Sequence, residues 1–224
     1  LVLARRAARA APPPAAAPPP SPIRYLSLFS GIEAATVAWH PLGWQPVAFA
    51  EIDPFCSALL AHYYPTIPNL GDVTKVDWAS YRGQCDVLIG GFPCQSFSVA
   101  GLRRSLNDTR GDLSLEYVKA VLAIDPPWTI AENVPGWLTT HDNAFGVFLG
   151  LLTGAASPLV PPGGKWDDAG VVSGPQRTAA FRVLCSQYQG VAQRRRRVFV
   201  LSVRGAGNWA CAEALFPVGQ GLRR

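Results

Sequence analysis

From Ile23 onward the sequence alternates between short apolar runs and helix-like segments, with short connections between them. Such alternation is typical of a parallel sheet whose strands are joined by helical crossovers. The sequence therefore predicts an α/β fold with a doubly wound, mostly parallel sheet. The expected strands span residues 24–30, 46–53, 85–91 and 126–134, and the expected helices begin at residue 32 and span residues 54–64, 112–124 and 143–153.

The last third of the chain has a different pattern. Two strand-like runs, 180–188 and 194–204, are separated only by the short stretch QGVAQ. Because no helix fits between them, we expect an antiparallel β-hairpin. The stretch 156–176 is rich in Gly and Pro and is predicted to be a loop. In the helix at 112–124, the spacing of Leu115, Val118 and Leu122 predicts that one face points to the core.

Composition limits the classes of protein that the chain can belong to. Hydrophobic residues make up 49% and charged residues 16%, so the chain can bury a core. The net charge of +5 permits a nucleic-acid partner without establishing one. Five cysteines without a CxxC pair predict neither a disulfide framework nor a metal site, and they favour a reducing compartment such as the cytoplasm. No apolar run reaches the ~18 residues that a membrane span needs. The first 22 residues are dominated by Ala, Pro and Arg and are predicted to be a disordered tail before a domain at 23–204.

The ends of the first two expected strands, together with the later stretch GDVT, suggest a cofactor site. The first turn, FSGIE, has one glycine and lacks the GxGxxG pattern, which argues against NAD or FAD and favours a nucleoside cofactor without a pyrophosphate, such as S-adenosylmethionine (SAM). Glu51 can accept hydrogen bonds from ribose hydroxyls, and Asp72 from an adenine amino group. Each acid alone is better explained as a solvated loop residue, but together they predict a cofactor rim. The residues expected there are Phe29, Gly31, Ile32, Glu51, Ile52, Asp72 and Val73.

The stretch GGFPCQSFS follows the third strand and carries Cys94. A free cysteine is usually a small buried hydrophobe. Here the thiol stands in a loop shaped by glycines and proline, at the edge of the sheet where such folds bind ligands. Gln95, Ser96 and Ser98 supply polar groups around it. We therefore predict that Cys94 is presented as a nucleophile.

In order and spacing, the segments LSLFSGIEAA, AEID, GDVT, GGFPCQSFS, ENV and QRRRR resemble the motifs of DNA (cytosine-5) methyltransferases of phages and bacteria. The resemblance covers residues 25–202. It implies a Rossmann-like SAM-dependent fold and methyl transfer to carbon 5 of a cytosine that is flipped out of double-stranded DNA. Two positions depart from the family pattern. Glu33 stands where many members carry glycine, and Cys185 stands where an aspartate is common.

The resemblance also implies roles for individual residues. Cys94 would add to carbon 6 of cytosine, Glu132 would act as a general acid at ring nitrogen 3, and Arg195 would donate to the carbonyl oxygen. Arg194 and Arg196 could reach phosphates or remain solvated. Substrate contacts are expected from Pro93, Gln95, Ser98, Asn133, Gln193 and Arg197, with no metal.

Other functions remain open at this stage. The chain could be a catalytically silent or split-enzyme fragment that binds SAM and DNA, or an RNA cytosine-5 methyltransferase on the same scaffold. Residues 205–224 are too few for a target-recognition region, so we expect a truncated C-terminal segment. A missing C-terminal recognition fragment is then an expected partner, and this chain alone should methylate DNA slowly or not at all.

Overall fold

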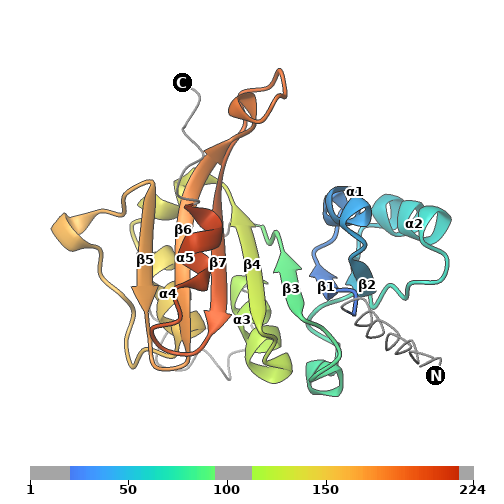
Figure 1. The fold of residues 1–224 in the computed structure, drawn as a ribbon, viewed down its shortest axis with the longest axis horizontal. Coiled ribbons are helices and arrows are strands. Elements are labelled where there is room, and N and C mark those ends of the chain that lie inside the picture. The colour runs from blue at the N-terminus through green and yellow to red at the C-terminus, as the bar shows by residue number, and fades with distance from the viewer. Residues whose placement is uncertain (1–20, 94–112, 217–224) are drawn as a thin grey trace, which may run out of the picture.

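The computed structural model describes residues 21–93 and 113–216, which build one seven-stranded sheet in the order β2-β1-β3-β4-β7-β6-β5 (Figure 1). The strands of this sheet are β1 (Arg24–Leu28), β2 (Gln45–Ala50), β3 (Val87–Gly90), β4 (Trp128–Asn133), β5 (Ala169–Ser173), β6 (Arg177–Cys185) and β7 (Arg196–Arg204).

Strands β1 to β4 form the parallel half of the sheet. Between them lie the helices α1 (Ala34–Trp39), α2 (Pro54–Tyr63) and α3 (Leu113–Ile124). A parallel pair needs a crossover connection, and these helices occur in the crossovers. The predicted α/β fold class is therefore confirmed, and the carboxyl ends of the four strands meet at one edge of the sheet.

Strands β5 to β7 form the antiparallel half. The predicted hairpin is confirmed, with β6 pairing β7 from Arg177 opposite Arg204 to Cys185 opposite Arg196. Strand β7 also pairs antiparallel with β4 and so joins the two halves. The prediction that residues 156–176 form a loop throughout was wrong, because β5 lies within them and pairs with β6. Gly170 weakened the strand pattern in the sequence. Glycine stands there because a Cβ would lie 2.6 Å from the Phe181 ring.

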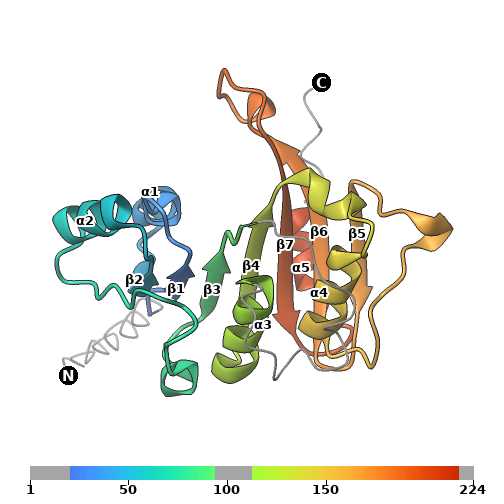
Figure 2. The same cartoon turned by 180° about the vertical axis from the view of Figure 1, so that it is seen from behind.

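Helices cover both faces of the sheet. Helix α3 and helix α4 (Ala144–Thr153) lie on one face, and α5 (Ala210–Leu215) lies on the other (Figures 1 and 2). The buried face of α3 is centred on Tyr117, Val121 and Ile124, whereas Leu122 is 38% exposed. Of the three predicted positions, Val118 is buried and Leu115 packs against the core, whereas Leu122 lies at the margin of the stripe that contacts the sheet.

The other connections are short. The chain turns through the 3-10 segments η1 (His40–Leu42), η2 (Trp78–Tyr81), η4 (Pro135–Thr139), η5 (Pro162–Gly164) and η6 (Ser186–Tyr188). Helix α5 extends the compact unit beyond residue 204, since Cys211 and Leu215 are buried against the sheet and Arg182 donates to the Leu215 carbonyl. In the described part of the chain, no helix combines the length and the apolar character that a bilayer span requires.

Candidate active site

The loop that follows β3 is shaped by its neighbours. A Cβ on Gly90 would lie 2.9 Å from ring atoms of Tyr117, and a Cβ on Gly91 would lie 3.1 Å from Oε2 of Glu132. A Cβ on Gly90 would force the buried Tyr117 ring to shift, and a Cβ on Gly91 would require the Glu132 carboxylate to move by a few tenths of an ångström. The double glycine therefore allows a ring to approach the loop closely on one side and a carboxylate on the other.

The same loop is anchored by Phe92. Its ring is buried in a cluster with Phe29, Tyr117, Trp137 and Phe148, with centroid distances of 5.3–6.2 Å. Such aromatic pairs stabilise a fold beyond the area they bury. This anchor was not identified from the sequence, where Phe92 was only one residue of a motif.

Asn133 at the end of β4 holds the loop from below. Its Nδ2 donates to the Phe92 carbonyl at 3.2 Å, and its Oδ1 accepts from the Val134 amide at 2.8 Å. Asn133 is 3% exposed, so it lies beneath the loop. Pro93 is exposed at the end of the described stretch. Cys94, Gln95 and Ser98 lie outside the described residues.

Glu132 and Arg197 form an ion pair that joins β4 to β7. The Nε atom of Arg197 lies 2.8 Å from Oε1 of Glu132, and the two side chains are 22% and 29% exposed. Arg196 points elsewhere and forms an ion pair with Asp168 at 2.6 Å. Arg195 is exposed. The arginine in contact with Glu132 is therefore Arg197, which was expected among the substrate contacts, and Arg195, the expected donor to the carbonyl oxygen, lines the same cavity.

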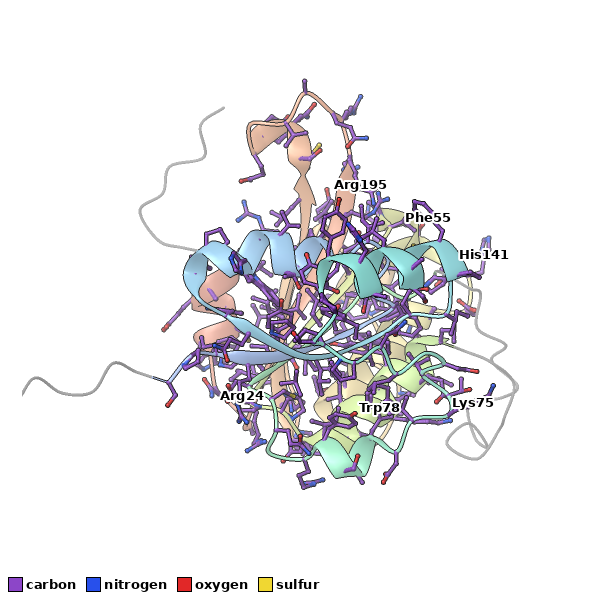
Figure 3. All side chains as sticks on the ribbon, turned by 90° about the vertical axis from the view of Figure 1, so that its right-hand side faces the viewer. Arg24, Phe55, Lys75, Trp78, His141 and Arg195 are labelled. Atoms are coloured by element: carbon purple, nitrogen blue, oxygen red, sulfur yellow. The ribbon has the colours of Figure 1, made fainter. Side chains whose placement is uncertain are left out.

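A cavity of about 690 Å³ opens beside this pair. Figure 3 shows Arg195 at the same edge of the molecule as Phe55 of α2, opposite Arg24 at the start of β1. The cavity thus lies at the edge where the parallel strands end. Cys185, which had no expected role, is part of its wall. Its lining includes Phe29, Ser30, Ala34, Gly90, Gly91, Glu132, Cys185, Gln189, Arg195 and Arg197.

The first βα turn has an unusual backbone. Phe29, Gly31 and Glu33 all have positive φ angles, of 54°, 55° and 62°. Such angles suit glycine and are disfavoured for other residues. Glu33 occupies this conformation while its Oε1 accepts from both the amide and the hydroxyl of Thr36, each at 3.1 Å. Its other oxygen, Oε2, is buried without a hydrogen-bond partner among the described residues, and burial raises the pKa of the Glu33 carboxyl.

Glu51 stands at the end of β2 and links two turns. Its Oε2 accepts from the Gly31 amide and its Oε1 from the Asp53 amide, both at 2.7 Å. A carboxylate oxygen has two lone pairs. Each oxygen therefore keeps one acceptor site for a hydroxyl group of a ligand, and this pair of acceptors fits the ribose hydroxyls of a nucleoside cofactor. Ile52 next to it is 70% exposed, as a residue that covers a ligand ring would be before binding.

The turn at residues 71–74, between α2 and β3, already uses its carboxylate in contacts with its own residues. The carboxylate of Asp72 accepts from the amide and hydroxyl of Thr74 and pairs with Lys75 at 3.2 Å. The hydrogen bonds from Thr74 and the neighbouring Lys75 hold the pKa of Asp72 below its usual range. Val73 is buried and its carbonyl accepts from the Trp78 indole. The Asp72 side chain is thus already engaged within its own turn.

The structure brings most of the expected residues to one edge, in two groups. The cavity wall contains Phe29, Glu132, Arg195 and Arg197. The second group does not line that cavity and lies on the remainder of the first turn and on the two turns beside it: Gly31, Ile32, Glu51, Ile52, Asp72 and Val73. Gln193 is exposed near the tip of the β6–β7 hairpin, where its carbonyl accepts from Ser186.

Comparison with known proteins agrees with this arrangement. The sequence profile of the C-5 cytosine-specific DNA methylases matches residues 23–155. A protein of Escherichia phage P1 named DNA N-6-adenine-methyltransferase is 46% identical in an alignment of 211 residues that covers 80% of this chain and 28% of that protein. The type II methyltransferase M.AquIA of Picosynechococcus is 31% identical in an alignment of 189 residues that covers 81% of this chain and 72% of that protein.

The solved structures support the same fold. The Dnmt2 methyltransferase of S. pombe superposes with a TM-score of 0.59 at 16% identity, over 81% of this chain and 50% of that one. The chain thus spans less than a third of the length of the phage P1 relative and most of the length of M.AquIA. The profile match, the similarity to M.AquIA and the shared fold show that the chain belongs to the C-5 cytosine-specific DNA methylase family.

Proposed function

We propose that this chain is the catalytic part of an enzyme that methylates carbon 5 of cytosine in double-stranded DNA. The observation that carries the proposal is the Glu132–Arg197 ion pair, which borders a cavity beside Gly91 at the start of the loop that leads to Cys94. The family and the fold are those of SAM-dependent methyltransferases. A nucleophile, an acid and a guanidinium are the groups that this reaction needs.

Cys94 would begin the reaction. Carbon 5 of cytosine is a weak nucleophile, and addition of a thiolate to carbon 6 moves an electron pair toward carbon 5 and ring nitrogen 3. Carbon 5 then takes the methyl group. Loss of the proton from carbon 5 and cleavage of the bond between carbon 6 and sulfur return the thiolate. The base must leave the helix for this attack, which costs ~a few kcal/mol.

Glu132 and the two arginines would stabilise the adduct. Glu132 would share a proton with ring nitrogen 3 as negative charge develops there. Arg197 holds this carboxylate in place, and Arg195, on the same cavity wall, is the candidate donor to the carbonyl oxygen. Asn133 would act through the loop and keep it in register beneath the substrate.

The cofactor would lie along the turns after β1 and β2 and along the turn at residues 71–74, which lies between α2 and β3. SAM supplies the methyl group when it is bound. Glu51 would accept from the ribose hydroxyls, Ile52 would cover the adenine, and Val73 would contact the ring edge. Because the Asp72 carboxylate is engaged with Thr74 and Lys75, we assign it a weaker part in adenine recognition than the sequence suggested.

The name of the phage P1 relative raises a second candidate, methylation of adenine at N6. An exocyclic amine attacks a methyl group without a covalent enzyme adduct, so such an enzyme has no use for a nucleophilic Cys94. This chain matches only 28% of that protein, and the named activity can reside in the remainder. RNA as substrate, and a silent or split-enzyme role, are the further alternatives.

The test uses the fate of a modified base. Duplex DNA containing 5-fluorocytosine should form a denaturation-resistant adduct with the protein in the presence of SAM, because fluorine blocks the final loss of a proton. Cys94→Ser should abolish the adduct. Fluorocytosine-substituted tRNA is the parallel arm, and digestion of DNA after transfer of labelled methyl groups separates methylcytosine from methyladenine. Label on adenine alone, or an adduct that persists in Cys94→Ser, would disprove the proposal.

Recognition of a particular DNA sequence is proposed to require residues outside this chain, since the phage P1 relative is more than three times as long as the matched part. Supplying a C-terminal segment of such a relative in trans should then increase methylation. A DNA substrate in a bacterial or phage-infected cell would place the protein in the cytoplasm.

A further inference from the structure

Asn69 lies between the second and third turns of the sheet edge and bonds to both. Its Oδ1 accepts from the amides of Glu51 at 3.0 Å and Gly71 at 3.2 Å. Its Nδ2 donates to the Glu51 carbonyl at 3.0 Å and to the Ser57 hydroxyl at 3.1 Å. All four hydrogen-bonding positions of one exposed side chain are thus used.

The backbone around Asn69 explains this geometry. Residues 68–70 run parallel to the end of β2: the Phe49 amide donates to the Pro68 carbonyl, and the Leu70 amide donates to the Phe49 carbonyl. This backbone pairing involves Phe49 and does not continue to Glu51. The side-chain amide of Asn69 then takes the place of a further peptide group, because it bonds both the N–H and the C=O of Glu51.

Asn69, which lies outside β2, therefore holds the main chain of Glu51 in place. Its carboxylate is oriented from the other side by the amides of Gly31 and Asp53, each at 2.7 Å. Through Gly71, the same Asn69 amide fixes the start of the turn that carries Asp72 and Val73. One side chain therefore sets the positions of two turns that face the cofactor in the proposed function.

We propose that Asn69 is a positioning residue for cofactor binding, acting by holding Glu51 and the Gly71 turn in register. The proposal rests on the assignment of the ribose-binding role to Glu51. It does not require contact between Asn69 and the cofactor. An amide is needed because an aspartate would place an oxygen against the Glu51 carbonyl and the Ser57 hydroxyl, and would lose two donors.

The experiment measures SAM affinity by calorimetry on the full chain. Asn69→Ala and Asn69→Asp should each weaken binding by roughly tenfold, the equivalent of about one charge-assisted hydrogen bond. The matched control is Asn208→Ala: this exposed asparagine likewise donates to a carbonyl, that of Arg204, and accepts from an amide, that of Ala210. The control should bind SAM like the unmodified protein.

A double-mutant cycle separates positioning from a general loss of structure. If Asn69 acts through Glu51, then Asn69→Ala should have little further effect on SAM affinity in a Glu51→Ala background. Full additivity of the two losses, or unchanged affinity in Asn69→Ala, would overturn the inference while the proposed function stands. Failure of the unmodified chain to bind SAM at all would overturn the cofactor assignment and this inference together.

Discussion

Glu132 and Arg197 meet on one face of two antiparallel strands, with Nε of Arg197 2.8 Å from Oε1 of Glu132. In the β4–β7 ladder Glu132 stands opposite Phe199, and Arg197 is two residues before Phe199 on β7. Residues two apart on a strand share a face, so the pair is a diagonal cross-strand contact. The two side chains are partly exposed at the cavity, and both form part of its wall.

Replacing this carboxylate should affect the chemical step. Glu132→Gln keeps the shape of the side chain but cannot transfer a proton to ring nitrogen 3, so single-turnover methyl transfer should slow by about 10²–10⁴-fold. SAM binding, measured by calorimetry, should not change, because the Glu132 carboxylate is paired with Arg197 of β7 and not with the residues that would hold the ribose and adenine. A normal rate in Glu132→Gln would remove this residue from the mechanism.

Replacing Arg197 and replacing Arg195 should affect the rate of methyl transfer in different ways. Arg197→Ala removes the partner of Glu132 and should reduce methyl transfer as strongly as Glu132→Gln does, with little further loss in the double variant. Arg195→Ala should reduce the rate independently of Glu132. The matched control is Arg196→Ala, whose ion partner is Asp168 rather than a cavity residue. The three rates are compared by the same single-turnover assay, and equal losses for Arg196 and Arg197 would contradict the assignment.

Glu51→Gln keeps the shape of the side chain but should still weaken SAM binding. Both carboxylate oxygens accept from backbone amides, so Glu51→Gln must set its NH₂ group against the N–H of Gly31 or Asp53. The SAM affinity of Glu51→Gln should therefore fall by at least roughly tenfold, similarly to that of Glu51→Ala. Calorimetric titration of both variants decides the matter. A Gln variant that binds as well as the unmodified chain would move the ribose partner elsewhere.

Asn133 should matter for stability. Asn133→Ala leaves the buried Phe92 carbonyl without this partner, and a buried unsatisfied group costs about 1–3 kcal/mol. For a chain of this size, 1 kcal/mol corresponds to about 2–4 °C in Tm, so we expect a decrease of at least about 2 °C. Thermal unfolding followed by circular dichroism measures it, with Asn208→Ala as the exposed control. A shift no larger than that of the control would show that Asn133 does not hold the loop.

Glu33 should make stability depend on pH. Burial raises the pKa of its carboxyl in the folded state, so folding favours the protonated form. This contribution is fully present below the unfolded-state pKa, near 4.5, and is lost as the pH rises through the folded-state value. The Gln side chain in Glu33→Gln stays neutral at all pH values. The Tm of Glu33→Gln minus the Tm of the unmodified chain should therefore increase from pH 5 to pH 8.

The groups that face Glu33 do not obscure this test. Thr36, Ser27 and Ser30 do not titrate, and burial raises the pKa of Tyr25 to about 12. Burial and the nearby Glu33 also raise the pKa of Tyr64 above its usual value, so neither tyrosine titrates between pH 5 and pH 8. The other acids with shifted pKa values, Asp53 and Asp72, are the same in both proteins, so their contributions cancel in the difference. A Tm difference that is constant from pH 5 to pH 8 would contradict the buried-carboxyl explanation.

Much of the architecture could be predicted from local sequence. Apolar runs of strand length alternating with helical segments predicted the parallel half, and the short QGVAQ connection predicted the β6–β7 hairpin. These features depend on neighbouring residues alone. Strand β5 was missed because Gly170, which the Phe181 ring of another strand requires, weakened its strand pattern.

The order of motifs was sufficient to indicate the family and to select Glu51, Glu132 and the arginine run. Sequence by itself determined which side chains lie at the carboxyl ends of strands, since the period of a strand and its end are local properties. Only the tertiary structure decided that Arg197 contacts Glu132, that Asn133 lies beneath the loop, and that Asn69 holds Glu51. Each of these contacts joins residues from different elements, and their partners depend on strand order and register, which no local pattern specifies.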